Sequence, residues 1–129
     1  MIASGLDAPY QTVFSSGVHS SIADVPIEKG GGGNGFGPHE LLEAALATCL
    51  TMTARMHAAK HGLPLTGARS EVRIDRSAAG EATLLYTVEF EGELSEAQTR
   101  ELNVAVAHCP VARTLTGKLE VKREGRTAV

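Results

Sequence analysis

The stretch GPHELLEAALATCLTM, residues 37 to 52, places Cys49 among small apolar residues and strong helix formers. Pro38 suits the first turn of a helix, and the residues after it favour a helix as far as about Lys60. Apolar residues recur in this segment every three or four positions, which is the spacing of one helix face. That face consists of Leu42, Ala45, Leu46, Cys49, Met52, Thr53 and Met56. We therefore expect a long helix with the Cys49 thiol on its inward side.

Two short strands and a loop are predicted before this helix. Residues 10 to 29 mix β-branched and aromatic residues with Ser and Gly, which indicates two strands that turn near Ser16 and Gly17. The glycine-rich residues 30 to 37 indicate a loop that leads into the helix. This loop lacks the Gly-Lys-Ser/Thr ending of a phosphate loop, so we expect a flexible entry segment or lid and not an anion site.

A β-hairpin is predicted after the helix, which Gly62 and Pro64 end. Segments 67 to 77 and 81 to 91 alternate apolar and polar residues, as half-buried strands do. The turn-forming pair Ala79-Gly80 lies between them.

A second helix is predicted from a capping box that Ser95 and Gln98 form. Its apolar stripe consists of Leu102, Ala105, Val106 and Cys109. Pro110 is expected to stop this helix, so Cys109 lies on the inward stripe at its C-terminal end. Residues 118 to 124 alternate and predict a closing strand.

The order of these elements predicts the fold class. Two strands, a helix, two strands, a helix and a strand indicate an α+β fold, with two main helices covering a mostly antiparallel sheet. The 129 residues have the length of one common domain, so we expect residues 1 to 129 to form a single domain.

Charge and composition exclude several classes of function. The chain has 12 Lys and Arg against 15 Asp and Glu, and its basic residues form no stripe, which argues against nucleic-acid binding. Its first residues, MIASGLDAPY, resemble no signal peptide, and no segment approaches the roughly 18 to 20 apolar residues of a membrane span. Two cysteines are too few for a secreted disulfide scaffold. We therefore expect a cytoplasmic protein that binds neither nucleic acid nor membrane.

The two cysteines allow two interpretations. Cys49 and Cys109 are both expected to point inward from separate helices, which suits an attacking thiol and a resolving thiol. Free cysteine is also among the most buried residue types and packs as a small hydrophobe. Spacing alone leaves both interpretations open.

The longer motifs resemble the OsmC/Ohr family of osmotically inducible and organic-hydroperoxide-resistance proteins. They are GPHELLEAALATCL, the preceding IADVPIEKGGGG, and CPVARTL, which begins sixty residues after Cys49. The resemblance covers nearly the whole chain. It implies an intertwined homodimer with active sites at the subunit interface, and no metal, flavin or haem.

The resemblance also implies a reaction. Cys49 would attack an organic hydroperoxide and become a sulfenic acid, Cys109 would condense with it, and a dithiol, lipoyl-linked in some relatives, would reopen the disulfide. Phe36, beside the glycine-rich loop, would help to close the pocket over the substrate. The apolar wall of that pocket would come from the helix residues Leu42, Leu46, Met52 and Met56, which are otherwise plain core.

This sequence departs from the family in its charged residues. Relatives place a Glu directly after the helix-opening Pro and an Arg near the amino terminus, whereas here His39 follows Pro38 and Glu40 comes one position later. No Arg precedes Arg55, which leaves Arg113, four residues past Cys109, as the candidate replacement.

Glu40 precedes Cys49 by nine residues, about 13.5 Å along one helix and about 180° around it. Within one straight helix the two cannot touch. We expect Glu40 either to act on the thiol of the other subunit or to serve as an ordinary first-turn acid.

The sequence is compatible with functions other than a peroxidase. His57 and His61 have the i, i+4 spacing that can bind a metal, but Cys49 lies about 80° from His57 on the helix, and we expect no metal. The same fold could instead bind a small apolar or thiol-bearing ligand without turnover. Acyl or sulfur transfer on Cys49, with Cys109 a bystander, is the other alternative. We expect a cysteine-based peroxidase that prefers organic hydroperoxides.

Overall fold

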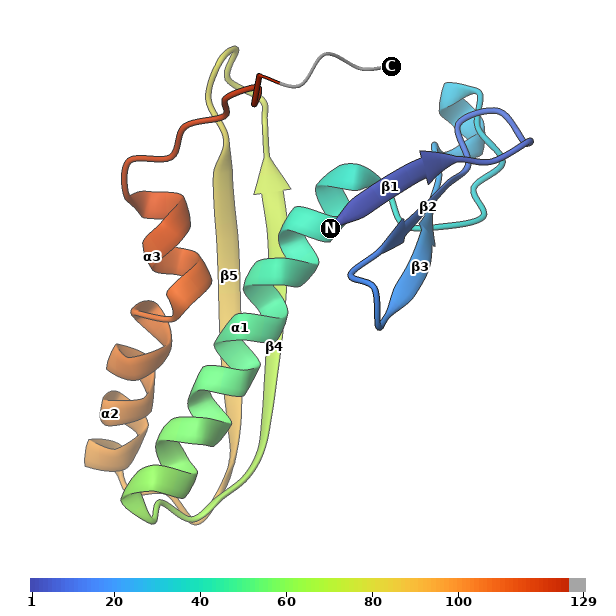
Figure 1. Ribbon diagram of the computed structural model, residues 1–129. Coiled ribbons are helices and arrows are strands. Elements are labelled where there is room, and N and C mark those ends of the chain that lie inside the picture. Colours follow the sequence, from blue (N-terminus) through green and yellow to red (C-terminus); the bar gives the residue numbers. More distant parts are fainter. Residues whose placement is uncertain (126–129) are drawn as a thin grey trace. The chain divides into compact units, whose positions relative to one another are not determined.

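The computed structural model describes residues 1 to 125 and contains both helices and antiparallel strands (Figure 1). These residues form two compact units. The first unit contains residues 1–45 and 72–85, and the second contains residues 46–71 and the described residues from 86 onward. The α+β class that the sequence predicts is confirmed.

The first unit contains a three-stranded antiparallel sheet. Its strands are β1 (Ile2–Gly5), β2 (Thr12–Ser15) and β3 (Ser20–Ala23), in that order across the sheet. The predicted turn between β2 and β3 is confirmed, with Gly17 at a positive φ of 96°. β1 was not predicted, because IASG has no apolar alternation and becomes a strand only by pairing with β2.

The glycine-rich loop lies against β3, after a short 3-10 turn, η1 (Ile27–Lys29). The backbone of Phe36 pairs with the strand: its N–H donates to Ile22 O at 3.1 Å, and its C=O accepts from Asp24 N at 3.0 Å. A Cβ on Gly35 would collide with the backbone carbonyl of Ile22. Glycine is therefore required here for the close approach of two backbones.

Helix α1 (Pro38–His61) is confirmed, and it ends at Gly62, whose φ is 64°. Its buried side chains are Leu46, Leu50, Ala54 and Ala58, which recur every four residues. The predicted inward face is therefore partly wrong. Cys49 and Thr53 are half-buried, but four members of that face are exposed in the single chain: Leu42, Ala45, Met52 and Met56. The helix is apolar on more than one side, so helical spacing alone is consistent with either of two buried faces.

Strands β4 (Leu65–Asp75) and β5 (Thr83–Gly92) form a two-stranded sheet, and Ala79 and Gly80 lie in the turn between them. The predicted hairpin is confirmed, with its strands shifted by at most two residues. In the second unit, α1 contacts β4 through a hydrogen bond from Thr51 Oγ1 to Ser70 Oγ of 3.0 Å.

Helix α2 (Glu96–Ala107) begins with the predicted capping box. Gln98 N donates to Ser95 Oγ at 3.1 Å, and Ser95 N donates to Gln98 Oε1 at 3.0 Å. Its buried residues, Leu102 and Val106, belong to the predicted stripe. The sequence therefore located the start and the inward face of α2 correctly.

The chain after α2 differs from the prediction. Pro110 does not only end a helix: it begins a third one, α3 (Pro110–Thr116), and Cys109 is the N-cap of α3 instead of the last residue of α2. A proline at the first helical position lacks only an N–H that would have no partner there, so it favours a new start.

The predicted strand at residues 118 to 124 is not formed. Glu120 pairs with both Lys118 and Lys122, and Leu119 and Val121 are exposed. Alternation of polar and apolar residues makes a strand only where another strand offers hydrogen bonds, and none in residues 1–125 pairs with this segment. Within the same described range, no helix has both the length and the apolar character that crossing a bilayer requires.

A buried carboxylate fastens the glycine-rich loop to β3. Asp24 is only 3% exposed, and its carboxylate accepts hydrogen bonds from Val25 N at 2.7 Å and Asn34 N at 3.0 Å. The bond from the Asn34 backbone is the main cause that lowers the Asp24 pKa below its ordinary 3.8. The ionised form is therefore the one that holds the loop.

We predict that Asp24→Asn lowers the thermal stability at neutral pH, and that the difference shrinks on acidification. A lowered pKa contributes stability above the unfolded value near 3.8, and this contribution is lost as the pH falls through the folded value. Thermal unfolding between about pH 3 and 7 measures the difference. Asp7→Asn, at an exposed position, is the control, and an Asp24→Asn deficit that does not change with pH would contradict the prediction.

Candidate functional site

The second unit brings the two cysteines together at the start of α3. Cys49 is half-buried on α1, and its Sγ accepts a hydrogen bond from Val111 N at 3.5 Å. Cys109 is fully buried, and its Sγ accepts from Ala112 N at 3.4 Å. Both donors belong to the first turn of α3, so one helical turn positions both sulfurs.

The two thiols differ in their electrostatics. Burial raises the pKa of Cys109, and the adjacent Cys49, by hydrogen bonding and by its charge, raises it further. The N–H of Ala112 opposes this shift without cancelling it. Cys109 therefore stays a protonated thiol at neutral pH, whereas Cys49 is the member of the pair with partial access to solvent.

The predicted residues before Cys49 belong mainly to the first unit. Glu40 Oε1 accepts a hydrogen bond from Gly37 N at 3.2 Å, so its carboxylate serves the start of its own helix. His39 is exposed in the same turn. Phe36 is 50% exposed, and its backbone is engaged with β3. Leu42 is also exposed in this unit.

The predicted wall residues of the second unit differ in exposure. Leu46 is 4% exposed and forms part of the core, whereas Met52 is 59% exposed. Sequence reasoning missed the donors of Val111 and Ala112, because they are backbone groups; the signal was the Cys-Pro step, which places a cysteine at an N-cap.

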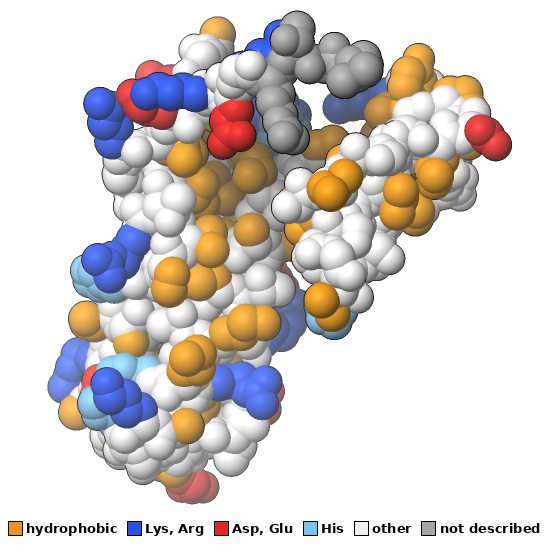
Figure 2. Space-filling model, viewed as in Figure 1, with side chains coloured by type: hydrophobic (Ala, Val, Ile, Leu, Met, Phe, Trp, Pro, Cys, Tyr) orange, Lys and Arg blue, Asp and Glu red, His pale blue; other side chains and the backbone are white. Residues whose placement is uncertain are grey.

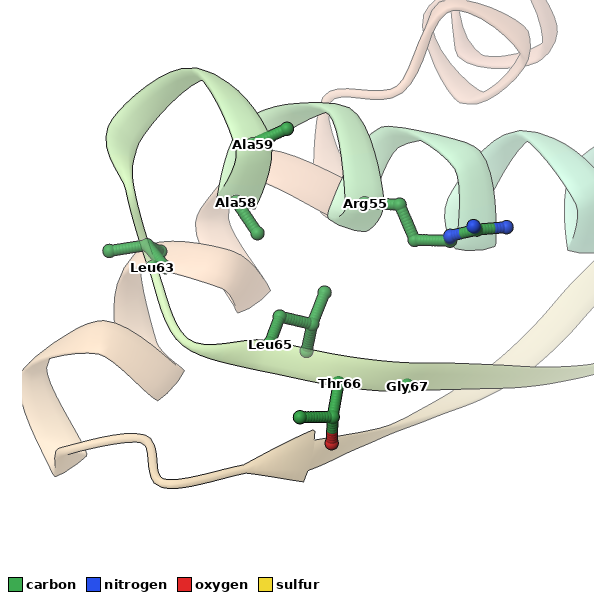
Figure 3. Close-up of a pocket in the computed structure, with 7 residues that line it drawn as sticks. All are labelled: Arg55, Ala58, Ala59, Leu63, Leu65, Thr66 and Gly67. Atoms are coloured by element: carbon green, nitrogen blue, oxygen red, sulfur yellow. The ribbon is translucent and has the colours of Figure 1, made fainter.

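Two arginines lie on helices of the second unit. Arg113 is exposed on α3, and its backbone N–H donates to Cys109 O at 3.0 Å. Arg55 borders a cavity of about 210 Å³ with Ala58 and Leu65 (Figure 3), and its guanidinium extends away from both. Arg55 follows Cys49 by six residues, so the two side chains point about 120° apart on α1. Arg55 is therefore poorly placed to assist the thiol.

The histidines do not form the metal site that includes the cysteines. His108 Nδ1 bonds to Val104 O of its own helix at 2.9 Å, and Cys49 bonds to Val111. His57 and His61 lie together instead with Glu101 of α2, within 4.8 Å of one another at their ligand atoms.

Comparisons with known proteins identify relatives of this fold. The sequence profile described as OsmC-like protein matches residues 30–124. An OsmC like protein from Mycoplasma pneumoniae has a TM-score of 0.69 at 24% identity, covering 83% of this chain and 79% of that chain. No protein of curated function matches the sequence.

Two further structures carry names that refer to hydroperoxides. The organic hydroperoxide resistance protein OsmC from Legionella pneumophila has a TM-score of 0.65 at 21% identity, covering 90% of this chain and 87% of that one. The organic hydroperoxide resistance protein OhrB of Bacillus subtilis has a TM-score of 0.63 at 22% identity, covering 94% and 92%. At these identities the likeness shows the shared fold.

The geometry predicts unequal reactivity of the two thiols. We expect iodoacetamide to alkylate Cys49 faster than Cys109 at pH 7, because Cys109 is fully buried and its raised pKa leaves it less of the reactive thiolate. Mass spectrometry of peptides from reduced protein, sampled over time, measures both rates. In Cys49→Ser only the slow reaction should remain, and equal rates at the two positions would refute this difference.

Proposed function

Because the chain belongs to the OsmC-like protein family, we propose that it is a cysteine-based peroxidase that detoxifies organic hydroperoxides. The observation that carries the proposal is the contact of a half-buried thiol, Cys49, with a fully buried one, Cys109. Two relatives of the same fold are named organic hydroperoxide resistance proteins, which supports the choice of substrate.

The proposed reaction has two steps. The Cys49 thiolate attacks the terminal oxygen of the hydroperoxide, the O–O bond breaks, and the alkoxide takes a proton and leaves as an alcohol. Cys49 is then a sulfenic acid. The sulfur of Cys109 attacks the sulfur of Cys49, water leaves, and a disulfide forms. The protein has lost the two electrons that reduced the peroxide, and a dithiol restores both thiols by exchange.

The environments of the two thiols suit this order. Peroxide meets Cys49 first because Cys109 is fully buried. The raised pKa of Cys109 keeps it protonated and out of the first step, and its position beside Cys49 makes it the nearest nucleophile for the second. The Val111 N–H holds the Cys49 sulfur at the start of α3, where Cys109 is the N-cap.

The proposal includes a homodimer, in which the other predicted site residues have a role. Four exposed apolar residues of α1 lie on one side of the helix and form what we call the α1 apolar face: Leu42, Ala45, Met52 and Met56. Figure 2 shows hydrophobic side chains exposed along α1. An exposed apolar stripe of this kind is typical of a protein interface, and a second copy would cover it. In an active site that both copies complete, we assign Glu40 to act on the thiol of the other copy and Phe36 to bind substrate. His39 and Arg113 would have auxiliary roles there.

The homodimer can be tested at the α1 apolar face. Met52→Glu combined with Met56→Glu should convert the dimer to a monomer, because each glutamate would bury an unpaired charge in the interface. Sedimentation velocity of both proteins measures the assembly. Val18→Glu introduces the same charge at a position that is 84% exposed and should leave the dimer intact. If the double variant sediments like the unchanged protein, the α1 apolar face is not part of the dimer interface.

The peroxidase reaction has a direct test. Reduced protein mixed with one equivalent of cumene hydroperoxide should lose both thiols and form the Cys49–Cys109 disulfide, with steady turnover when a dithiol is added. Cys49→Ser should abolish turnover, whereas Cys109→Ser should stop at a sulfenic acid that dimedone traps. Rapid mixing should show a faster reaction with cumene hydroperoxide than with hydrogen peroxide, because organic hydroperoxides are the substrate class that the names of the two hydroperoxide-resistance relatives suggest.

Survival of both thiols in peroxide would favour the second candidate function, binding of a small apolar ligand without turnover. A specific feature supports that candidate: the first unit contains a cavity of about 550 Å³. Its lining is mostly apolar and comes from β1 to β3 and the start of α1, with Phe14, Val25 and Leu41 among its residues. A ligand retained in native mass spectrometry of the purified protein would then identify this function. Full peroxidase activity in Cys109→Ser would instead indicate a different chemistry of Cys49.

A further inference from the structure

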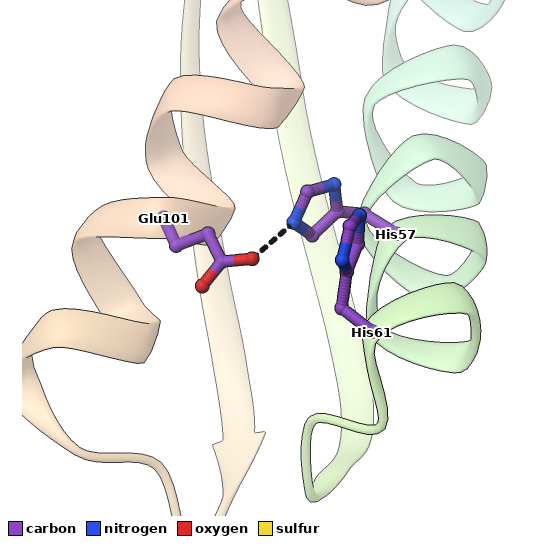
Figure 4. A group of neighbouring side chains, drawn as sticks. All are labelled: His57, His61 and Glu101. Atoms are coloured by element: carbon purple, nitrogen blue, oxygen red, sulfur yellow. Dashed lines mark hydrogen bonds and ion pairs between the residues drawn. The ribbon is translucent and has the colours of Figure 1, made fainter.

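We propose that His57, His61 and Glu101 form a binding site for a divalent transition-metal ion of the zinc class. This site lies in the second unit, apart from the thiol pair, and has no part in the peroxidase reaction proposed above. Its ligand atoms, one from each residue, all lie within 4.8 Å of one another. In Figure 4 the two histidines of α1 project toward the carboxylate of α2.

The distances between the ligand atoms are close to those that a metal requires. Zinc binds histidine nitrogen and carboxylate oxygen at about 2.0–2.2 Å in a tetrahedron, which sets its ligand atoms about 3.3–3.5 Å apart. His57 Nε2 and Glu101 Oε1 are now 2.7 Å apart, joined by a hydrogen bond (Figure 4). An ion would take the place of the proton between them: in the neutral imidazole the ring proton would move to Nδ1, which leaves Nε2 free to bind the ion. The required adjustments are below about 1.5 Å and can be made by side-chain rotation.

The position of His61 distinguishes a metal site from a helix-to-helix hydrogen bond. The His57–Glu101 bond alone would join α1 to α2 and needs no third residue. His61 is exposed, yet its ring lies beside that of His57 with ring centroids 4.2 Å apart and an interplanar angle of 33°. The i, i+4 spacing on one helix directs both imidazoles to the same side, which is the arrangement that paired histidine ligands use.

The donor set and its exposure define the class of ion. Two imidazole nitrogens and one carboxylate oxygen suit zinc and its neighbours in the first transition row better than magnesium or calcium, which prefer all-oxygen sites. Three protein ligands leave a fourth position for water or an exogenous ligand. The side chains of His57 and Glu101 are 23% and 43% exposed, so the ion can reach the site from solvent.

A cavity lies beside the proposed metal site and borders its fourth coordination position. It measures about 530 Å³ and is lined by Thr53, His57, Glu101, Val104, Ala105 and His108. Two of the proposed ligands therefore form part of its wall. Bound metal would fasten the C-terminal part of α1 to α2 and present an open coordination position at the edge of this cavity.

The test measures metal binding with the full chain after treatment with a chelator. Zn²⁺ should raise the thermal unfolding temperature, because it binds the folded protein and no such site exists in the unfolded chain. Isothermal titration with Zn²⁺ should give one site per chain. His61→Ala should weaken binding by more than about tenfold, a lower bound set by the effect of losing even an outer-shell partner of a metal ligand. This variant keeps the His57–Glu101 hydrogen bond, so its fold should be preserved.

Control variants separate this site from the thiols and from surface histidines. His19→Ala, at an exposed turn, should bind Zn²⁺ as the unchanged protein does, and so should Cys49→Ser combined with Cys109→Ser. Co²⁺ gives a second readout on the unchanged protein: visible bands of a tetrahedral nitrogen and oxygen site, without the near-ultraviolet band of sulfur ligation.

Three results would overturn the proposal. They are the absence of Zn²⁺ binding, unaltered affinity in His61→Ala, and binding that disappears with the cysteines. The same measurements leave the peroxidase proposal untouched, because they require no peroxide and no turnover.

Discussion

The first turn of α3 is the constraint on which the candidate active site depends. Its N–H groups at Val111 and Ala112 each donate to one sulfur, and Cys109 caps the helix that provides them. A cysteine at an N-cap would ordinarily satisfy only its own helix. Here the second donor holds a thiol from another helix, so the geometry of a single backbone turn sets the sulfurs side by side. Pro110 fixes that turn by its restricted φ.

Much of the fold could be predicted from local signals in the sequence. The Ser95–Gln98 capping box, the Pro38 start of α1 and the Gly62 stop each act within four residues, and all three are where the sequence placed them. Predictions that depended on distant partners fared worse. β1 exists because β2 offers it hydrogen bonds, and residues 118 to 124 are not a strand because no described strand does so. Alternation of polar and apolar residues shows that a segment can form a strand. Whether it does depends on a neighbouring strand that offers hydrogen bonds.

The inward face of α1 also depends on packing partners that the spacing of its own residues does not identify. Leu50 and Ala54 are buried where Met52 and Met56 were expected, yet both sets recur at helical spacing. A helix that is apolar on most sides buries its apolar side chains only when other elements pack against more than one side. The core of one chain buries the side of α1 that carries Leu50. The α1 apolar face remains exposed to solvent, which is why a second copy is part of the proposed site.

The candidate site was only partly accessible to sequence reasoning, for a physical reason. Cys49 and Cys109 could be singled out as inward thiols, but the difference in their environments follows from complete burial of one and partial burial of the other. Glu101 could not be connected to His57, because 44 residues and a hairpin separate them. Once α2 packs beside α1, that carboxylate meets the histidine pair.

Two separate chemistries can therefore share α1. His57 follows Cys49 by eight residues, which is about 12 Å along a helix, and His61 is about 6 Å farther. A metal ion bound to the histidines would be too distant to touch the Cys49 sulfur, and the sulfur is already held by Val111.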